Sequence, residues 1–250
     1  MGYVLGIDLG TSSLKGLLMN KSGEVVAFAG ADYSLLHPKK GYSEQNGEEW
    51  IKACETVFSK LIEKVSDFQK ELEGIAISGQ MHGLVTLDEN YNTVRPAILW
   101  NDTRTTAQCA EIMEDFGERL IEITKNKALE GFTLPKILWM KEEEPGLWEK
   151  TAHIMLPKDY LIFRLTGELA TDYSDAAGTL LLDVAAKKWS DEILEKYGID
   201  AKILPKLYNS IDCVGKVSPE YREKFGFEKE IKVMGGGADN ACAAVGSGIT

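Results

Sequence analysis

Apolar residues at the start of the chain form short runs separated by a turn of glycine and small hydroxyl residues. Residues 4–9 and 17–19 are such runs, and the turn between them is Gly10-Thr11-Ser12-Ser13. Short apolar runs joined through a glycine-containing turn are typical of a β-hairpin. A third run, residues 24–29, follows a turn at residues 21–23 and predicts another strand. The chain is therefore expected to begin with three successive strands.

The next segment has the spacing of an amphipathic helix. Between residues 46 and 66 the apolar side chains recur at intervals of three and four, at Trp50, Ile51, Cys54, Val57, Phe58, Leu61, Ile62 and Val65. Residues 74–78 and 97–100 are short apolar runs and predict two further strands. Asp102 is expected to cap a helix that extends to Phe116.

The middle of the chain is predicted to be mostly helical. Pro135 and Pro157 can lie in the first turns of two helices, and Ser190 can cap a third. Near the end, residues 231–234 predict a strand and residues 241–245 a helix of small side chains. Three strands followed by alternating helices and strands indicate an α/β domain with a mixed sheet and helices packed on it.

The composition is that of a soluble globular protein. The 250 residues are 44% hydrophobic and 27% charged, which suits one large or two small α/β domains. A net charge of −11 argues against nucleic-acid binding, which relies on basic patches. The four cysteines are widely spaced, without a CxxC pair, and indicate a reducing compartment. The sequence has neither a signal-peptide pattern nor a bilayer-spanning apolar run, so we expect a cytoplasmic protein without membrane partners.

Asp8 and the turn after it are candidates for binding phosphate. Amide groups crowded in a tight turn form a nest for anions, and the hydroxyls of Thr11, Ser12 and Ser13 add donors. Asp8 is placed to hold the water shell of a phosphate-bound Mg²⁺, an ion that takes few protein ligands directly. The alternative is that Asp8 only hydrogen-bonds the turn. Because the GK[ST] of a Walker motif is missing, the residues alone leave both interpretations open.

Asp239 follows three glycines at a predicted strand-to-helix junction. Consecutive glycines cost backbone entropy, which is understandable where the chain passes close to another group or to a ligand. An aspartate at such a junction is well placed as a general base beside a hydroxyl substrate. It is equally typical of a helix N-cap, so both interpretations stay open. The segment Gly235–Asn240 lacks the last glycine of a dinucleotide fingerprint.

Polar groups also follow two of the predicted strands. Gln80 and His82 lie on a turn bracketed by glycines, which suits a ligand with many hydroxyl groups. A lone histidine after a strand is more often structural, and the residues alone favour that interpretation. The other two histidines lie far away in the sequence, without the spacing of metal ligands. Trp100 can pack on the apolar face of a sugar or belong to the core.

Taken together, these segments resemble the FGGY carbohydrate kinases. The matching segments occur in the order of that family, at Gly6–Ser12, Gly79–Gly83, Leu99–Asp102 and Gly236–Ala241. Gly131–Glu143 is similar to the family's first signature. Within the family, the sequence is most similar to those of the xylulose kinases in the segments Gln80-Met81-His82-Gly83, Leu156–Tyr160 and Ser174–Thr179.

The resemblance implies two actin-like (ribonuclease H-like) domains that close over a sugar and ATP. Residues 1–250 would be the N-terminal, sugar-binding domain, with a mixed five-stranded sheet flanked by helices. The implied reaction is phosphorylation of D-xylulose to D-xylulose 5-phosphate by Mg²⁺-ATP, with Asp239 as general base and Asp8 holding Mg²⁺ through water. The ATP phosphates would contact Gly10, Thr11, Ser12, Ser13 and Lys15. The sugar would contact Gln80, Met81, His82, Trp100, Asn101, Asp102, Asp239 and Asn240.

The family's second signature is absent, and the chain ends soon after the predicted helix at 241–245. We therefore expect the C-terminal, ATP-binding domain to be missing, and the 250 residues alone to bind nucleotide weakly and to lack kinase activity. The face that this domain would cover should favour self-association, including a homodimer. The alternatives are an FGGY kinase for another ketose, polyol or sugar acid, and a non-catalytic sugar-binding module with an actin-like fold.

Overall fold

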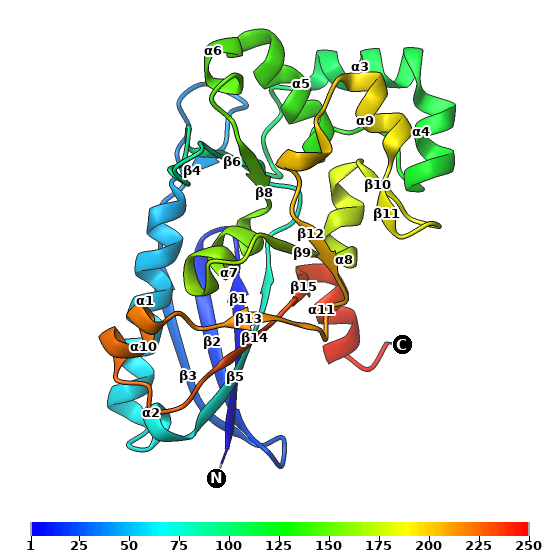
Figure 1. The fold of residues 1–250 in the computed structure, drawn as a ribbon. Coiled ribbons are helices and arrows are strands. Elements are labelled where there is room, and N and C mark those ends of the chain that lie inside the picture. Colours follow the sequence, from blue (N-terminus) through cyan, green and yellow to red (C-terminus); the bar gives the residue numbers. More distant parts are fainter. Residues whose placement is uncertain (1, 250) are drawn as a thin grey trace.

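A mixed β-sheet forms the centre of the fold that the computed structural model describes for residues 2–249 (Figure 1). The strands lie in the order β13-β14-β5-β1-β2-β3, and β15 pairs with the end of β5. β1 pairs antiparallel with β2 and parallel with β5. The strands are β1 (Tyr3–Leu9), β2 (Ser13–Asn20), β3 (Val25–Asp32), β5 (Leu72–Gly79), β13 (Cys213–Lys216), β14 (Lys232–Met234) and β15 (Gly237–Ala238).

Five strands of this sheet are those that the apolar pattern predicted, β1, β2, β3, β5 and β14. The expected number of five is nevertheless too small, since β13 and β15 bring the sheet to seven strands within residues 2–249. Neither addition is visible as an apolar run, because β13 reads Cys-Val-Gly-Lys and β15 reads Gly-Ala. After the break at Gly235 and Gly236, β15 resumes the parallel pairing with β5 that β14 began.

The apolar run at residues 97–100 belongs to a separate two-stranded sheet. Its strand, β7 (Ala97–Ile98), pairs with β4 (Glu44–Gln45) rather than with the central sheet. Other short pairs join β6 to β8, β9 to β12 and β10 to β11. These strands are β6 (Val85–Leu87), β8 (His153–Met155), β9 (Ala170–Asp172), β12 (Lys206–Tyr208), β10 (Leu182–Asp183) and β11 (Lys188–Trp189).

Helix α1 (Gly47–Lys64) covers one face of the central sheet, as its apolar spacing predicted. Its buried face includes Trp50 and Val57 and packs against β2 and β3. The side chain of Asn46 caps the helix by accepting a hydrogen bond from the second backbone amide of the helix. Helix α7 (Pro157–Thr166) begins at the expected proline and packs beside α1.

A second hydrophobic core lies above the central sheet in the view of Figure 1. Helices α3 (Thr106–Asp115), α4 (Gly117–Thr124), α5 (Thr133–Glu143), α6 (Pro145–Trp148) and α9 (Asp191–Tyr197) gather there. Ser190 caps α9 as expected, because its Oγ accepts a hydrogen bond from Ile193 N at 3.3 Å. The remaining helices are α2 (Phe68–Glu71), α8 (Tyr173–Ala176), α10 (Pro219–Phe225), α11 (Asp239–Gly246) and the 3₁₀ turns Ala177–Thr179 and Ala201–Ile203. No helix within residues 2–249 is long and apolar enough to span a bilayer.

The opposite face of the N-terminal strands stays uncovered in the described part of the chain. Side chains alternate between the two faces of a strand, so Leu5 is buried under α1 while Val4, Leu17 and Phe28 are exposed. Apolar side chains gathered on one open face mark a surface that binds a ligand or another protein part. Asp8 belongs to this same side of β1.

The variant Gly236→Ala tests how closely the β14–β15 connection approaches β5. Gly236 has a φ of 70°, and a Cβ at this position would lie 1.9 Å from Ile77 O. We expect the left-handed strain, about 1–2 kcal/mol, and the backbone clash together to lower the free energy of unfolding by at least about 3 kcal/mol in urea titrations. In the control Gly23→Ala the φ is 81° and the space around the new Cβ is open, so the left-handed strain alone should lower the free energy of unfolding. Equal losses in the two variants would contradict the close approach.

Candidate active site

The ends of three strands bring most of the predicted site residues to one edge of the central sheet. Asp8, near the end of β1, lies in register with Ser78 of β5. β15 pairs in parallel with the same end of β5. Met81 and His82 follow β5, and Asp239 follows β15. Segments that follow neighbouring parallel strands meet at one edge of the sheet, which is where α/β proteins commonly bind ligands.

A cavity of about 230 Å³ lies at this edge and is lined by Met81, His82, Trp100 and Asp239. All four were expected to contact a sugar, and the fold brings them together from three distant parts of the chain. Trp100 is 46% exposed, so its ring is free to pack against a ligand. An apolar wall with a few directed polar groups is the usual lining of a small-molecule site.

A second hollow, of about 450 Å³, opens on the uncovered face of the sheet. Asp8, Lys15 and Ser78 line it, together with Gly236 and Cys242 near α11. Ser78 Oγ donates a hydrogen bond to Asp8 Oδ1 at 3.2 Å. A carboxylate and an ammonium facing the same hollow suit a phosphate group accompanied by a cation.

Asp239 is the first residue of α11, and the N-cap of that helix is Ala238. The N-cap interpretation of Asp239 is therefore wrong. Its carboxylate accepts a hydrogen bond from the backbone amide of the next residue, Asn240 N, at 2.6 Å. Partial burial raises the pKa of Asp239, and the negative charge of Asp8 raises it further, against the effect of the Asn240 amide. A carboxylate with a raised pKa is a better proton acceptor than an ordinary one.

His82 is held in one orientation and one protonation state. Its Nδ1 lies 3.0 Å from Gly178 O, and because a carbonyl oxygen only accepts, Nδ1 carries the proton and donates. Burial, together with the charge of Lys136, lowers the pKa of His82 to about 4, although the bond to Gly178 opposes both effects. The ring is therefore neutral at physiological pH, and Nε2 is left as a hydrogen-bond acceptor.

The turn between β1 and β2 is anchored through its carbonyl groups. Tyr33 Oη donates to Gly10 O at 2.5 Å, and Gln45 Nε2 donates to Thr11 O at 2.7 Å. Trp100 Nε1 donates to Thr11 Oγ1 at 3.0 Å, so the cavity and the turn share a contact. The hydrogen bonds within residues 2–249 leave the amides of Thr11 and Ser12 free, as an anion nest requires.

Other residues predicted to contact the sugar lie elsewhere. Gln80 is buried beneath the turn and donates to Gln45 Oε1 at 2.9 Å, so it supports the turn from below. Asn101 is exposed in the bend after Trp100, and Asn240 is exposed on α11. Neither lines the 230 Å³ cavity. Their contact with a sugar stays a prediction.

Asp102 lies buried under the second core. Its carboxylate accepts hydrogen bonds from Ser43 N at 2.6 Å and from Arg104 Nε at 2.9 Å. The guanidinium of Arg104 is in turn packed on the rings of Tyr42 and Trp139. The prediction that Asp102 caps α3 is wrong, because the N-cap is Thr105 and the carboxylate is taken by these partners. The geometry does not bring Asp102 to the cavity, and its sugar contact also stays a prediction.

A buried ionic cluster behind Asp239 was not expected from the sequence. Lys158 Nζ lies 2.5 Å from Asp159 Oδ1 and 3.0 Å from Asp172 Oδ1, and all these side chains are fully buried. Asp172 Oδ2 accepts from Ser174 Oγ at 2.5 Å, and Ser174 Oγ accepts from Ala238 N at 3.0 Å. The cluster therefore holds the backbone immediately before Asp239.

The protonation of this cluster follows from its burial. Burial opposes the charge of Lys158, but the surrounding carboxylates more than offset it, so the pKa of Lys158 is raised. Burial also raises the pKa of Asp159 and, more strongly, that of Asp175, whose Oδ2 lies 3.7 Å from Lys158 Nζ. In the sequence, this cluster was indicated only by the segments Leu156–Tyr160 and Ser174–Thr179, which resemble those of the xylulose kinases.

No group of three or more His, Cys, Asp or Glu side chains within residues 2–249 forms a ready metal site. Asp8 nevertheless fits the way proteins hold Mg²⁺, which keeps several waters and takes one or two carboxylates together with phosphate oxygens. Its carboxylate faces the 450 Å³ hollow, beside Lys15.

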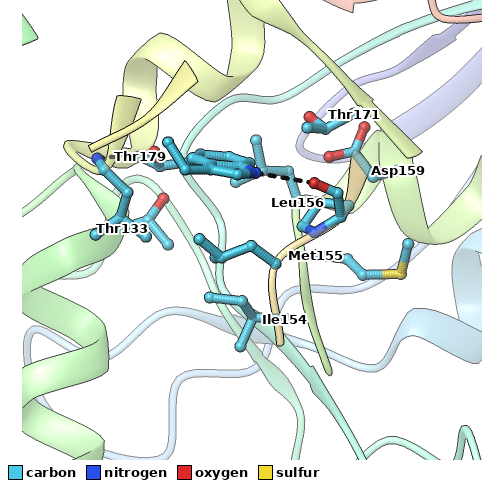
Figure 2. Close-up of a pocket in the computed structure, with 11 residues that line it drawn as sticks. Thr133, Ile154, Met155, Leu156, Asp159, Thr171 and Thr179 are labelled. Atoms are coloured by element: carbon cyan, nitrogen blue, oxygen red, sulfur yellow. Dashed lines mark hydrogen bonds between the residues drawn. The ribbon is translucent and has the colours of Figure 1, made fainter. Parts of the chain in front are cut away.

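A third cavity, shown in Figure 2, is too small for a ligand. It measures about 20 Å³ and is lined by Thr133, Leu156 and Asp159 among mostly apolar neighbours. In its lining, Trp189 Nε1 donates a hydrogen bond to Pro205 O at 3.0 Å. This volume holds about one water molecule.

Comparison with known proteins identifies the family. Residues 3–246 match the N-terminal domain of the FGGY family of carbohydrate kinases. The chain belongs to this family. The xylulose kinase of Lactococcus lactis is 56% identical over 249 residues, which cover 100% of this chain and 50% of that protein. The chain thus spans about half the length of the relatives that it matches.

Solved structures show the same fold. A xyloylose kinase from Brucella ovis superposes with a TM-score of 0.95 at 38% identity, covering 98% of this chain and 50% of that one. A gluconate kinase from Lactobacillus acidophilus superposes with a TM-score of 0.94 at 27% identity, covering 99% and 50%. The actin-like α/β class expected from the sequence is confirmed.

The neutral state of His82 predicts a pH dependence. The pKa of His82 is lowered from 6.5 to about 4 in the folded chain, so between these values the unfolded chain holds a proton that the folded chain lacks. The contribution of neutral His82 to the free energy of unfolding is therefore complete above the pKa of the unfolded chain. It is lost as the pH falls through the pKa of the folded chain. We expect ¹⁵N NMR of the imidazole to show neutral His82 at about pH 5.5, where an ordinary histidine is mostly protonated. A titration midpoint near 6.5 would contradict the buried, Gly178-bonded ring.

Proposed function

We propose that this chain is the N-terminal, sugar-binding domain of an ATP-dependent kinase that converts D-xylulose to D-xylulose 5-phosphate. The observation that carries the proposal is the 230 Å³ cavity, which places the carboxylate of Asp239 beside Met81, His82 and Trp100. The similarity to xylulose kinases along the whole chain supports the choice of sugar. Membership in a carbohydrate-kinase family supports the choice of reaction.

The cavity has the groups that phosphorylation of a hydroxyl requires. Asp239 accepts the proton of the attacking sugar hydroxyl. At the same time the hydroxyl oxygen bonds to the γ-phosphorus of ATP, and the bond between this phosphorus and the leaving ADP breaks. His82 Nε2 accepts a hydrogen bond from another hydroxyl, and Trp100 packs against the carbon chain. Most of the rate enhancement then comes from alignment of the hydroxyl with the γ-phosphate, since phosphoryl transfer needs little covalent chemistry from the protein.

The 450 Å³ hollow beside this cavity suits the ATP phosphates. The free amides of Thr11 and Ser12 and the ammonium of Lys15 supply donors to the phosphate oxygens. Asp8 would hold Mg²⁺ through water in this hollow. When bound, Mg²⁺ neutralises charge on the transferred phosphoryl group. The charge of Asp8 already acts on the pKa of Asp239, which supports the two hollows acting as one site.

The uncovered face of the sheet supports a role for a second domain. Val4, Leu17 and Phe28 are 43%, 36% and 52% exposed on the side of the sheet that carries Asp8. The relatives are about twice as long as this chain. We propose that a second domain covers this face, binds the adenosine part of ATP and closes the site against water.

A neutral ketose fits the cavity better than a sugar acid does. The lining has no cationic side chain, since His82 is neutral and the other groups are Met81, Trp100 and the Asp239 carboxylate. The carboxylate of a sugar acid would meet the negative charge of Asp239 without a cation to balance it. A family kinase for another neutral ketose or polyol stays the second candidate. A non-catalytic module would have no use for Asp8 and Asp239 together.

The ligand preference can be measured on the chain itself, which contains its own core. D-xylulose should raise the midpoint of thermal unfolding more than glycerol or gluconate does, because only a ligand that binds the native state adds stability. His82→Ala should remove the difference between D-xylulose and glycerol. Equal shifts for the three ligands, or an unchanged difference in the variant, would count against the assignment.

The role of Asp239 can be measured in a two-domain enzyme that carries this chain. Asp239→Asn keeps the size of the side chain but accepts no proton at neutral pH, so kcat should fall on the order of 10²-fold or more, with sugar binding largely retained. Asp191→Asn is the matched control, because Asp191 also begins a helix and is exposed away from the site. Near-normal turnover of Asp239→Asn would exclude the general base.

A further inference from the structure

The segment Gly131–Glu143 does not line the sugar cavity, yet the start of its helix contacts His82, a residue that does. Two side chains at the start of α5 donate hydrogen bonds to the backbone carbonyl of His82. Thr133 Oγ1 lies 3.0 Å from His82 O, and Lys136 Nζ lies 3.4 Å from it. The helix thus holds a cavity residue through its main chain.

His82 needs such support because its backbone is strained. Its φ is 65°, in the left-handed region, which is unfavourable for a residue with a side chain. The strain arises in a tight turn, where Gly83 N donates to Met81 O at 2.8 Å. Non-glycine residues persist in this region only when their surroundings hold them there, and they are concentrated at functional sites.

Lys136 is an unusual choice for a position buried so deeply. Its side chain is fully buried, and within residues 2–249 no carboxylate forms an ion pair with it. Its ammonium donates instead to main-chain carbonyls, those of Gly131, Phe132 and His82. Burying an ammonium without a direct ion-pair partner costs stability. Burial accordingly lowers the pKa of Lys136 to about 7, although the negative charge of Asp102 opposes this effect.

The ring of His82 is confined from the other side as well. Nδ1 donates to Gly178 O, and a Cβ on residue 178 would lie 2.2 Å from that same nitrogen. The ring of Phe132 packs against the imidazole, with 4.6 Å between the centroids. Main chain and ring are therefore fixed by two separate segments, the start of α5 and the turn at Gly178.

We propose that Thr133 and Lys136 are positioning residues for sugar recognition, which hold the strained turn at His82 so that its Nε2 faces the ligand. The proposal rests on the proposed function, because it takes the occupant of the cavity to be a ketose. Neither residue lines the cavity. Asp239 is held separately, by Ser174 and the Lys158 cluster. Loss of the Thr133 hydroxyl should therefore raise KM more than it lowers kcat.

The test compares Thr133→Val, which removes the hydroxyl with little change of shape, with Thr133→Ser, which keeps it. Thr86→Val is the matched control, since the Thr86 hydroxyl is buried and has no hydrogen-bond partner in the described structure. Calorimetry on the chain should show that Thr133→Val weakens D-xylulose binding on the order of 3- to 10-fold. Thr133→Ser and Thr86→Val should bind as the wild type does. Lys136→Met should also weaken D-xylulose binding.

A second measurement needs no ligand. The chain has three histidines, so the His82 imidazole can be followed by ¹⁵N NMR. Its pKa of about 4 should rise toward 6.5 in Thr133→Val and stay unchanged in Thr133→Ser. If Thr133→Val leaves both this pKa and the affinity unchanged, the positioning role is overturned. If the pKa responds but no variant, including the wild type, binds D-xylulose, the positioning of His82 stands and the proposed substrate fails.

Discussion

A buried lysine among three aspartates organises the part of the fold that carries the site. Lys158 lies in the first turn of α7, Asp172 ends β9, and Asp175 belongs to α8, so one ammonium joins three elements. Through Ser174 the same cluster reaches the backbone before Asp239. Removing one partner of such a cluster leaves an uncompensated buried charge, which is far more costly than losing a surface ion pair. The position of Asp239 therefore depends on groups that never face the ligand.

The two sides of the cavity are supported by different means. Asp239 depends on the ionic cluster, whereas His82 depends on hydrogen bonds to its own carbonyl from Thr133 and Lys136. Both supports lie behind the cavity wall, and both are made of buried polar groups, whose interactions are strengthened by the low local dielectric. The side facing the 450 Å³ hollow is different, since the turn at Thr11 keeps free amides and Asp8 keeps a solvent-facing carboxylate. Hydrogen-bonded cavity walls and free amide donors are what the proposed sugar and phosphate sites require.

The parts predicted well from the sequence are those that local spacing determines. The β1–β2 hairpin, α1 and the starts of α7 and α9 follow from apolar periodicity, prolines and caps, which act over a few residues. The supports of the site depend on partners far along the chain, such as Ser43 with Asp102 or Ser174 with Ala238. Spacing carries no information about these pairs. Lys136 shows this limit clearly. A lysine inside the apolar run of α5 suggests an exposed side chain, but the side chain of Lys136 is fully buried.

A crystal structure of the protein with D-xylulose would show directly whether Met81, His82, Trp100 and Asp239 enclose the reacting hydroxyl of a neutral ketose. We expect the sugar to occupy the 230 Å³ cavity, with one hydroxyl within hydrogen-bond distance of the Asp239 carboxylate and another donating to His82 Nε2. We also expect Nδ1 of His82 to keep its bond to Gly178 O. A sugar bound elsewhere, or bound here with no hydroxyl near Asp239, would exclude this role of the cavity.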